Sequence, residues 1–184
     1  MTTLRLPRLF VAALAFFAVA SGVAEAASRA TIDRRVNEAL AEFREKVRGS
    51  DAVLSRAHGV LVFPKITKGG FGIGAEYGEG ALRIGGKNVA YYSTASGSVG
   101  FQIGLQGRRQ ILVFLDQEAL TKFRNSENWK VGVDGSVTVI TVGAGGEVDS
   151  QNINQPVVAF IFDSKGLMYN LSLEGSKITK INPK

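Results

Sequence analysis

The feature that most constrains this fold is an alternation of glycine with larger residues over residues 69–80, which read GGFGIGAEYGEG. Phe71, Ile73, Ala75 and Tyr77 occupy every second position, and glycine or glutamate fills the positions between them. Because residues two apart along a β-strand share a face, this spacing predicts a strand with side chains on one face and almost bare backbone on the other. Bare backbone in a strand is typical of close approach by another backbone, or of a sharp bend at a barrel corner.

Residues 98–106 repeat this alternation, with larger apolar residues separated by serine, glycine and glutamine. A nucleotide-binding loop is a much weaker interpretation. The dinucleotide fingerprint needs G-x-G-x-x-G at the start of a helix, whereas residues 72–78 have G-x-G-x-x-x-G and a further strand is expected after them. The sequence also lacks the glycine-lysine-serine or glycine-lysine-threonine of a phosphate-binding loop. We therefore interpret the glycines as architectural and expect neither a nucleotide nor a nucleic acid as ligand.

The rest of the chain predicts a few helices among many short strands. Residues 28–48 place apolar side chains at helical spacing, residues 51–57 favour a short second helix, and residues 117–124 follow a suitable N-cap in Asp116. Runs of β-branched and aromatic residues predict strands at 60–63, 71–77, 81–84, 89–93, 99–106, 110–115, 137–142, 157–162 and 167–173. Hairpin turns are expected at 85–88 and 163–166. We therefore expect one α+β domain, an antiparallel, curved or barrel-like sheet with an N-terminal amphipathic helix and one short inserted helix.

Residues 1–26 have the pattern of a signal peptide. Two arginines give a positive start, residues 9–20 are an uninterrupted apolar run, and Ala24-Glu25-Ala26 supplies the small residues of a cleavage site. The run is shorter than the ~18–20 residues that span a membrane. We expect cleavage after Ala26, a mature domain of residues 27–184, and export to the periplasm or envelope surface. An uncleaved N-terminal anchor is the alternative.

Residues suited to catalysis are few. The chain has no cysteine, and a Ser-His-Asp triad would depend on its single histidine, His58, for which we expect a capping or surface role. Glu76 and Glu79 could form a carboxylate pair, but no partner base or metal ligand accompanies them, so we expect them in a solvated strand and turn. We therefore expect no enzymatic activity, no metal and no cofactor.

Three stretches of the chain resemble the SYLF domain family. They read AHGVLVFPKITKGGFGIGAEYGEGALRIGG from Ala57, then SGSVGFQIGLQGRRQILVFLDQEALTKF, then FDSKGLMYNLSLEGSKI, and the resemblance covers residues 51–181. It implies a domain that binds membrane lipids, particularly phosphoinositides and other anionic lipids. Some eukaryotic members also bind actin, usually alongside an SH3 or FYVE domain. This sequence contains neither, and because we expect export, we do not expect actin as a partner.

Basic residues near the glycine-rich strands indicate where an acidic head group could bind. The formal net charge of +6 favours anionic partners in general. We expect these cations to cluster at the strand ends, with ordinary solvated turn residues as the alternative interpretation. The candidate lipid-binding residues are Lys65, Lys68, Phe71, Arg83, Lys87, Arg108 and Arg109.

The resemblance also implies a second route to lipid, because lipid binding in eukaryotic relatives is associated with an N-terminal amphipathic helix. Its counterpart here is residues 28–48, whose polar face mixes basic and acidic residues and whose only aromatic residue is Phe43. A membrane-surface helix usually has a predominantly basic polar face, so we favour packing of this helix on the sheet. The leading hypothesis is a non-enzymatic domain that associates peripherally with anionic phospholipid membranes. The alternative is an envelope protein-interaction or structural module without a lipid ligand.

Overall fold

The computed structural model describes residues 27–184 apart from residues 72, 100–105, 142–152, 163–172 and 174. The helices in this part of the chain are α1 (Arg29–Lys46), α2 (Ser50–Ser55) and α3 (Gln117–Asn125). The strands are β1 (Gly59–Phe71), β2 (Ile73–Ile84), β3 (Lys87–Val99), β4 (Gln106–Phe114), β5 (Asn128–Lys130), β6 (Thr138–Thr141), β7 (Val157–Phe162) and β8 (Lys177–Ile181).

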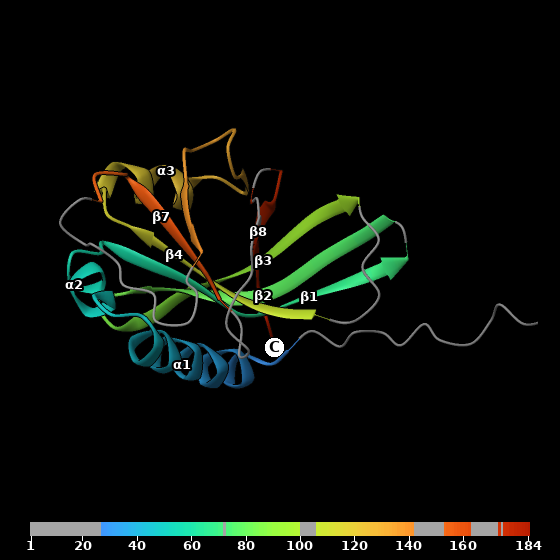
Figure 1. Ribbon diagram of the computed structural model, residues 1–184, viewed down its shortest axis with the longest axis horizontal. Helices are drawn as coiled ribbons and strands as arrows, with labels where there is room; N and C mark the ends of the chain where they lie inside the picture. Colours follow the sequence, from blue (N-terminus) through green and yellow to red (C-terminus); the bar gives the residue numbers. More distant parts are fainter. Residues whose placement is uncertain (1–26, 72, 100–105, 142–152, 163–172, 174) are drawn as a thin grey trace, which may run out of the picture.

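These strands form one curled sheet, a half-barrel in the order β5-β8-β3-β2-β1-β4-β7-β6 (Figure 1). Neighbouring strands are antiparallel except β6 and β7, which pair in parallel at one edge. Helix α1 lies along one face of the sheet and α3 lies on the other (Figure 1). The predicted α+β class and curved sheet are confirmed, and among the described strands the parallel edge pair departs from the expected antiparallel pattern.

The apolar stripe of α1 is buried against the sheet. Ile32, Val36, Leu40 and Phe43 are at most 3 % exposed, and they belong to one core cluster with residues of β1, β4 and β7. The ring of Phe43 lies 4.9 Å from that of Phe160, measured between centroids. Burying each of these large side chains contributes about 1.5–3 kcal/mol. The preference for packing over a free membrane-surface helix is therefore confirmed.

A second core fills the opposite side of the sheet, under α3. Leu120 and Phe123 of α3 pack there with Trp129 of β5 and Phe114 of β4. The helix begins as the sequence predicts, because the Asp116 side chain accepts a hydrogen bond from the Ala119 backbone N–H at 2.7 Å. We call the two sides of the sheet the α1 face and the α3 face. No helix among the described residues is long and apolar enough to cross a membrane.

Strands β1 and β2 approach closely where β1 contains a bulge. The register shifts between Val62 and Lys65, around Pro64, and a proline without an N–H is tolerated in a central strand only at such an irregularity. A Cβ atom on Gly78 would lie 2.7 Å from the Lys65 carbonyl oxygen, and one on Gly80 would collide with the Val62 carbonyl oxygen. The predicted architectural role of the glycines is confirmed at these two positions.

The glycines of β2 also explain why its bounds differ from the prediction. Residues 71–77 and 81–84 were expected to be separate strands, but residues 73–84 form the continuous strand β2, since its glycines let it pass the bulge without turning. The hairpin turn predicted at 85–88 is confirmed, with φ values of +56° at Gly85 and +78° at Gly86. Strands β5 and β8 were not predicted. The turn at 163–166, and most of the strands expected at 99–106 and 167–173, lie outside the described residues.

Substituting Gly80 tests the close approach. In Gly80→Ala, the added Cβ should force β1 and β2 apart and lower the free energy of unfolding by about 1–3 kcal/mol, as overpacking does elsewhere. Gly97→Ala is the matched control, because a Cβ on Gly97 of β3 would meet nothing within 4 Å. Urea unfolding compares the two variants, and equal stabilities would contradict the proposed constraint.

Candidate functional site

A cavity of about 340 Å³ lies between α1 and strands β1 and β4. Four basic residues line it, and three of these come from three different elements on the α1 side of the sheet, namely Arg35 of α1, Lys65 of β1 and Arg109 of β4. Glu38 supplies the one acidic side chain in the lining, and it is paired with Arg34 at 2.7 Å. The remaining lining residues are Ala39, Pro64, Gly107 and Arg108. Cations that are far apart in the sequence therefore meet in one hollow of the surface.

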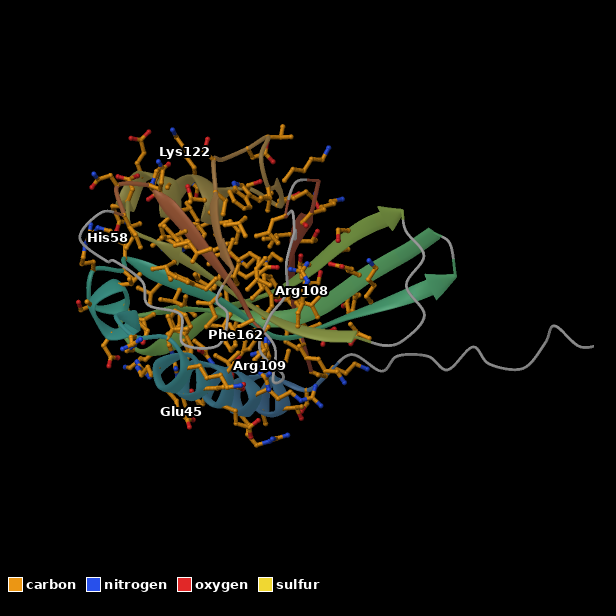
Figure 2. All side chains as sticks on the ribbon, in the orientation of Figure 1. Glu45, His58, Arg108, Arg109, Lys122 and Phe162 are labelled. Carbon is orange, nitrogen blue, oxygen red and sulfur yellow. The ribbon has the colours of Figure 1, made fainter. Side chains whose placement is uncertain are left out.

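The local structure explains how these cations come together. Lys65 directly follows Pro64, and the bulge there sets which residues of β1 lie on the α1 face. Arg108 and Arg109 are neighbours in β4, so their side chains point to opposite faces of the sheet. Figure 2 shows Arg109 on the side of α1 and Arg108 within the curl of the sheet. Arg35 precedes the buried Val36 and lies at the edge of the packed stripe of α1.

The charges in the cavity are only partly compensated. Arg109 Nη2 lies 3.0 Å from Glu42 Oε2, and both side chains are partly exposed. Arg35 and Lys65 are exposed, and neither forms an ion pair or a side-chain hydrogen bond within the described part of the chain. The cavity consequently presents two cations without counter-ions and a third whose ion pair is open to solvent. This arrangement suits an anionic group such as a phosphate.

Arg108, by contrast, is part of a buried polar cluster on the α3 face. Its Nη2 lies 2.6 Å from Glu76 Oε2, and its Nη1 donates to Gln110 Oε1 at 3.2 Å. Arg108 is 5 % exposed and Gln110 is fully buried. Arg108 Nε and Gln110 Nε2 have no hydrogen-bond partner among the described residues. Arg108 therefore stabilises a buried carboxylate, and its guanidinium does not lie at an exposed strand end.

The expectation that Glu76 is solvated is therefore wrong. It failed because β2 continues through Gly78 and carries Glu76 onto the α3 face, where Arg108 supplies the counter-ion. The Ser96 hydroxyl, 3.4 Å from the same carboxylate oxygen, is the other partner. Glu79 lies on the opposite face, because it is three residues further along the strand.

The other predicted site residues lie in different places on the sheet, and their part in lipid binding stays a prediction. Arg83 pairs with Val60 in register and donates to Asn37 of α1 at 2.8 Å, about 15 Å along β1 from Lys65 at ~3.3 Å per residue. Lys87 is exposed beside the β2–β3 turn. Lys68 is three residues beyond Lys65 on the same strand, and so points to the opposite face. Phe71 ends β1, and its side chain is outside the described part of the structure.

The described residues offer no group of three or more His, Asp or Glu side chains that could hold a metal ion. His58 is exposed, and its backbone N–H donates to the Phe114 carbonyl at 2.9 Å, which secures the start of β1. Figure 2 shows His58 at the left end of the domain, away from Arg108 and Arg109, which lie near its middle.

Sequence reasoning missed Arg35 as a site residue. It was counted with the mixed polar face of the helix, although its position beside the buried Val36 was a signal that it lies at the helix–sheet boundary. The Glu76–Arg108 pair had no comparable signal, because 32 residues separate the partners and only the three-dimensional pairing of β2, β1 and β4 brings them together.

The fold and the cation-lined cavity define an α+β domain with a candidate anion-binding site. Residues 95–183 match the family described as Ysc84, Las17-binding protein actin regulator. The match supports assigning the chain to the SYLF domain family, which is a family of binding domains, and it confirms the resemblance seen in the sequence. It includes Arg108 and Arg109, whereas α1, β1 and β2 precede it. A comparison with curated proteins finds no match.

A double-mutant cycle tests the buried ion pair. Glu76→Leu or Arg108→Met alone leaves one charge buried without its counter-ion, and we expect each to lower the free energy of unfolding by about 3–5 kcal/mol. The double variant should be much more stable than the sum of the two losses predicts, because it leaves no uncompensated charge. Urea unfolding of the four proteins measures the coupling, and additive losses would show that the pair does not act as a unit.

Proposed function

We propose that this chain is a non-enzymatic domain that associates peripherally with membranes containing anionic phospholipids, with a phosphoinositide or another acidic head group as ligand. We propose the cavity lined by Arg35, Lys65 and Arg109 as the head-group site. The observation that carries this proposal is that three elements each contribute a cation to one solvent-open cavity of about 340 Å³. Membership of a family of binding domains supports the same function.

Charge attraction alone would be too weak for stable binding. Each basic residue near an anionic surface contributes ~1 kcal/mol, so three give about 3 kcal/mol, which corresponds to a dissociation constant weaker than ~1 mM. For stable binding, directed hydrogen bonds must add to this charge attraction. Arg35 and Arg109 can each donate two parallel N–H bonds to a phosphate, and such bidentate, charge-assisted bonds are among the stronger polar contacts. A head group would compete with Glu42 for Arg109, because the two are already paired at 3.0 Å.

The packing of α1 favours binding by charge over binding by apolar insertion. Its large apolar side chains are buried against the sheet, so inserting them into a membrane would first require the helix to separate from its core. That separation would expose Val62, Ile111 and Phe160 as well. The docked helix instead offers Arg35 to the cavity, which is a contribution from its polar side.

We further propose that the domain acts outside the cytoplasm, in the periplasm or at the envelope surface, after removal of residues 1–26. The pattern of a positive start, an apolar run and Ala24-Glu25-Ala26 supports this location. Actin is not proposed as a partner, because an exported protein would not encounter it. An envelope protein as the only partner is the outcome to be distinguished by experiment.

Vesicle flotation with paired charge removals tests the site. The exported wild-type protein should float with anionic but not neutral vesicles, and less so at high salt, because salt screens exposed charges. Lys65→Gln/Arg109→Gln removes two cavity charges, equivalent to about 2 kcal/mol, and should weaken binding about thirtyfold. The matched control is Lys130→Gln/Lys177→Gln, which removes two exposed charges from the register-paired strands β5 and β8, at the other end of the sheet order.

The outcomes separate the competing interpretations. Loss of binding in the cavity variant and little change in the control would support the head-group site. Equal losses in both variants would replace the cavity with a diffuse basic surface. An absence of wild-type binding to any vesicle would contradict lipid as the ligand and leave a protein partner. Circular dichroism of each variant establishes that it is folded before binding is compared.

A further inference from the structure

The backbone nitrogen of Ala27 contacts a carboxylate on the central sheet. It donates to Glu79 Oε2 at 2.9 Å, across 52 positions in the sequence. Ala27 is partly buried and packs against the core beneath α1. The hydrogen bond therefore joins the residue that leads into α1 to strand β2, on the α1 face.

Glu79 is held in place to receive this nitrogen. Its other oxygen, Oε1, accepts a hydrogen bond from the Tyr77 hydroxyl at 2.8 Å. Burial of part of the tyrosine, with the hydrogen bond and negative charge of Glu79, raises the pKa of Tyr77 to about 12. The hydroxyl consequently stays protonated at neutral pH and remains a donor to the carboxylate.

The Ala27 nitrogen is also the atom that cleavage after Ala26 would release. Hydrolysis of the Ala26–Ala27 peptide bond adds water across it, so that Ala26 takes a carboxylate and Ala27 becomes an α-ammonium group. In the intact chain this nitrogen has one N–H and no charge. In the processed chain it has a positive charge and three N–H donors, and a carboxylate acceptor lies at hydrogen-bond distance.

We propose that the α-ammonium group of Ala27, freed by cleavage after Ala26, forms an ion pair with Glu79 that fastens the start of α1 to the sheet. Such a counter-ion would stabilise the start of the helix. Its first turn contains no acidic residue, and a positive chain terminus just before the N-cap Ser28 is repelled by the positive end of the helix dipole. Glu79 offsets both positive charges.

Two hydrogen bonds of Arg29 also hold this end of the helix in place. The Arg29 backbone N–H donates to the Lys184 carbonyl at 2.8 Å, and Arg29 Nε donates to the Pro183 carbonyl at 2.8 Å. Figure 1 shows the C-terminus beside the start of α1. The ion pair would thus add a contact between opposite charges to a junction that these hydrogen bonds already hold.

The ion pair would also change the charge beside the proposed head-group site. A smaller cavity of about 210 Å³ next to Ala27 is lined by the ionisable residues Arg35, Lys65, Tyr77 and Glu79. Two of these, Arg35 and Lys65, also line the larger cavity. Pairing Glu79 with the new terminus would neutralise the carboxylate that lines the smaller cavity beside those two cations. The docking of Ala27 does not itself depend on lipid binding.

The first experiment determines the terminus. The full chain is produced in a secreting bacterial host, and the intact mass of the exported protein is measured. A mass corresponding to residues 27–184 is expected. Retention of residues 1–26, or cleavage at another bond, would overturn the proposal.

The second experiment measures the ion pair by a double-mutant cycle in the same host. Inserting one alanine between Ala26 and Ala27 preserves the cleavage pattern but moves the ammonium group one residue away from Glu79. At pH 6, we expect this insertion to lower the folding equilibrium constant about fivefold in the wild-type background, and by much less in Glu79→Gln. Equal effects in the two backgrounds would contradict an ion pair with Glu79.

The pH dependence supplies a readout that packing alone would not change. An α-amino group in an unfolded chain titrates at about pH 7.7–8.0, and pairing with Glu79 should raise that pKa in the folded protein. The extra stability should therefore be complete below that range and be lost as the pH rises through the folded-state value. If Glu79→Gln does not fold, ¹⁵N-detected titration of the terminus decides between the outcomes. A raised pKa in the exported protein but not in the insertion variant supports the proposal, and equal values overturn it.

Discussion

The close approach of β2 to the bulge in β1 is the constraint on which the rest of the structure depends. At Gly78 and Gly80 the two backbones leave no room for a Cβ atom, and Pro64 interrupts the central ladder at the same level. The sheet can therefore curl around this point, and the chain leaves the bulge with Lys65 facing α1. The glycine-rich stretch resembles a ligand loop, but its role is to let the sheet curl, and the candidate site lies elsewhere, between α1 and the sheet.

The curl also assigns opposite roles to two neighbouring arginines. Arg108 faces the α3 side, where it neutralises the buried Glu76, and Arg109 faces α1, where its pair with Glu42 is reached by solvent. A buried ion pair of this kind is costly to break but does not present charge to a ligand. The exposed pair contributes little to stability and can be exchanged for a stronger anion. A step of one residue along β4 therefore separates the arginine of the buried ion pair from the arginine of the candidate site.

Much of the fold could be predicted from local patterns, but the site could not be predicted as a whole. The cap at Asp116, the apolar stripe of α1 and the Gly85–Gly86 turn depend on residues close in sequence, and each was predicted correctly. The short strands β5 and β8 carry weak periodicity and form because the sheet supplies partners. The basic residues were found by type, yet grouping them needed knowledge of register and facing. Register and facing place Lys65 apart from Lys68 and Arg83, and place it in the same cavity lining as Arg35 of α1.

Locating a head group on the folded domain tests the proposed site directly. Backbone and arginine side-chain NMR signals of the ¹⁵N-labelled exported protein would be followed while a soluble short-chain phosphoinositide is added. We expect saturable shifts at Lys65, Arg109 and Arg35 and at Gly107 of β4, with the signals of the buried Arg108 less affected. Shifts concentrated at Arg83 and Lys87, or no saturable shift at any residue, would contradict a head-group site between α1 and the sheet.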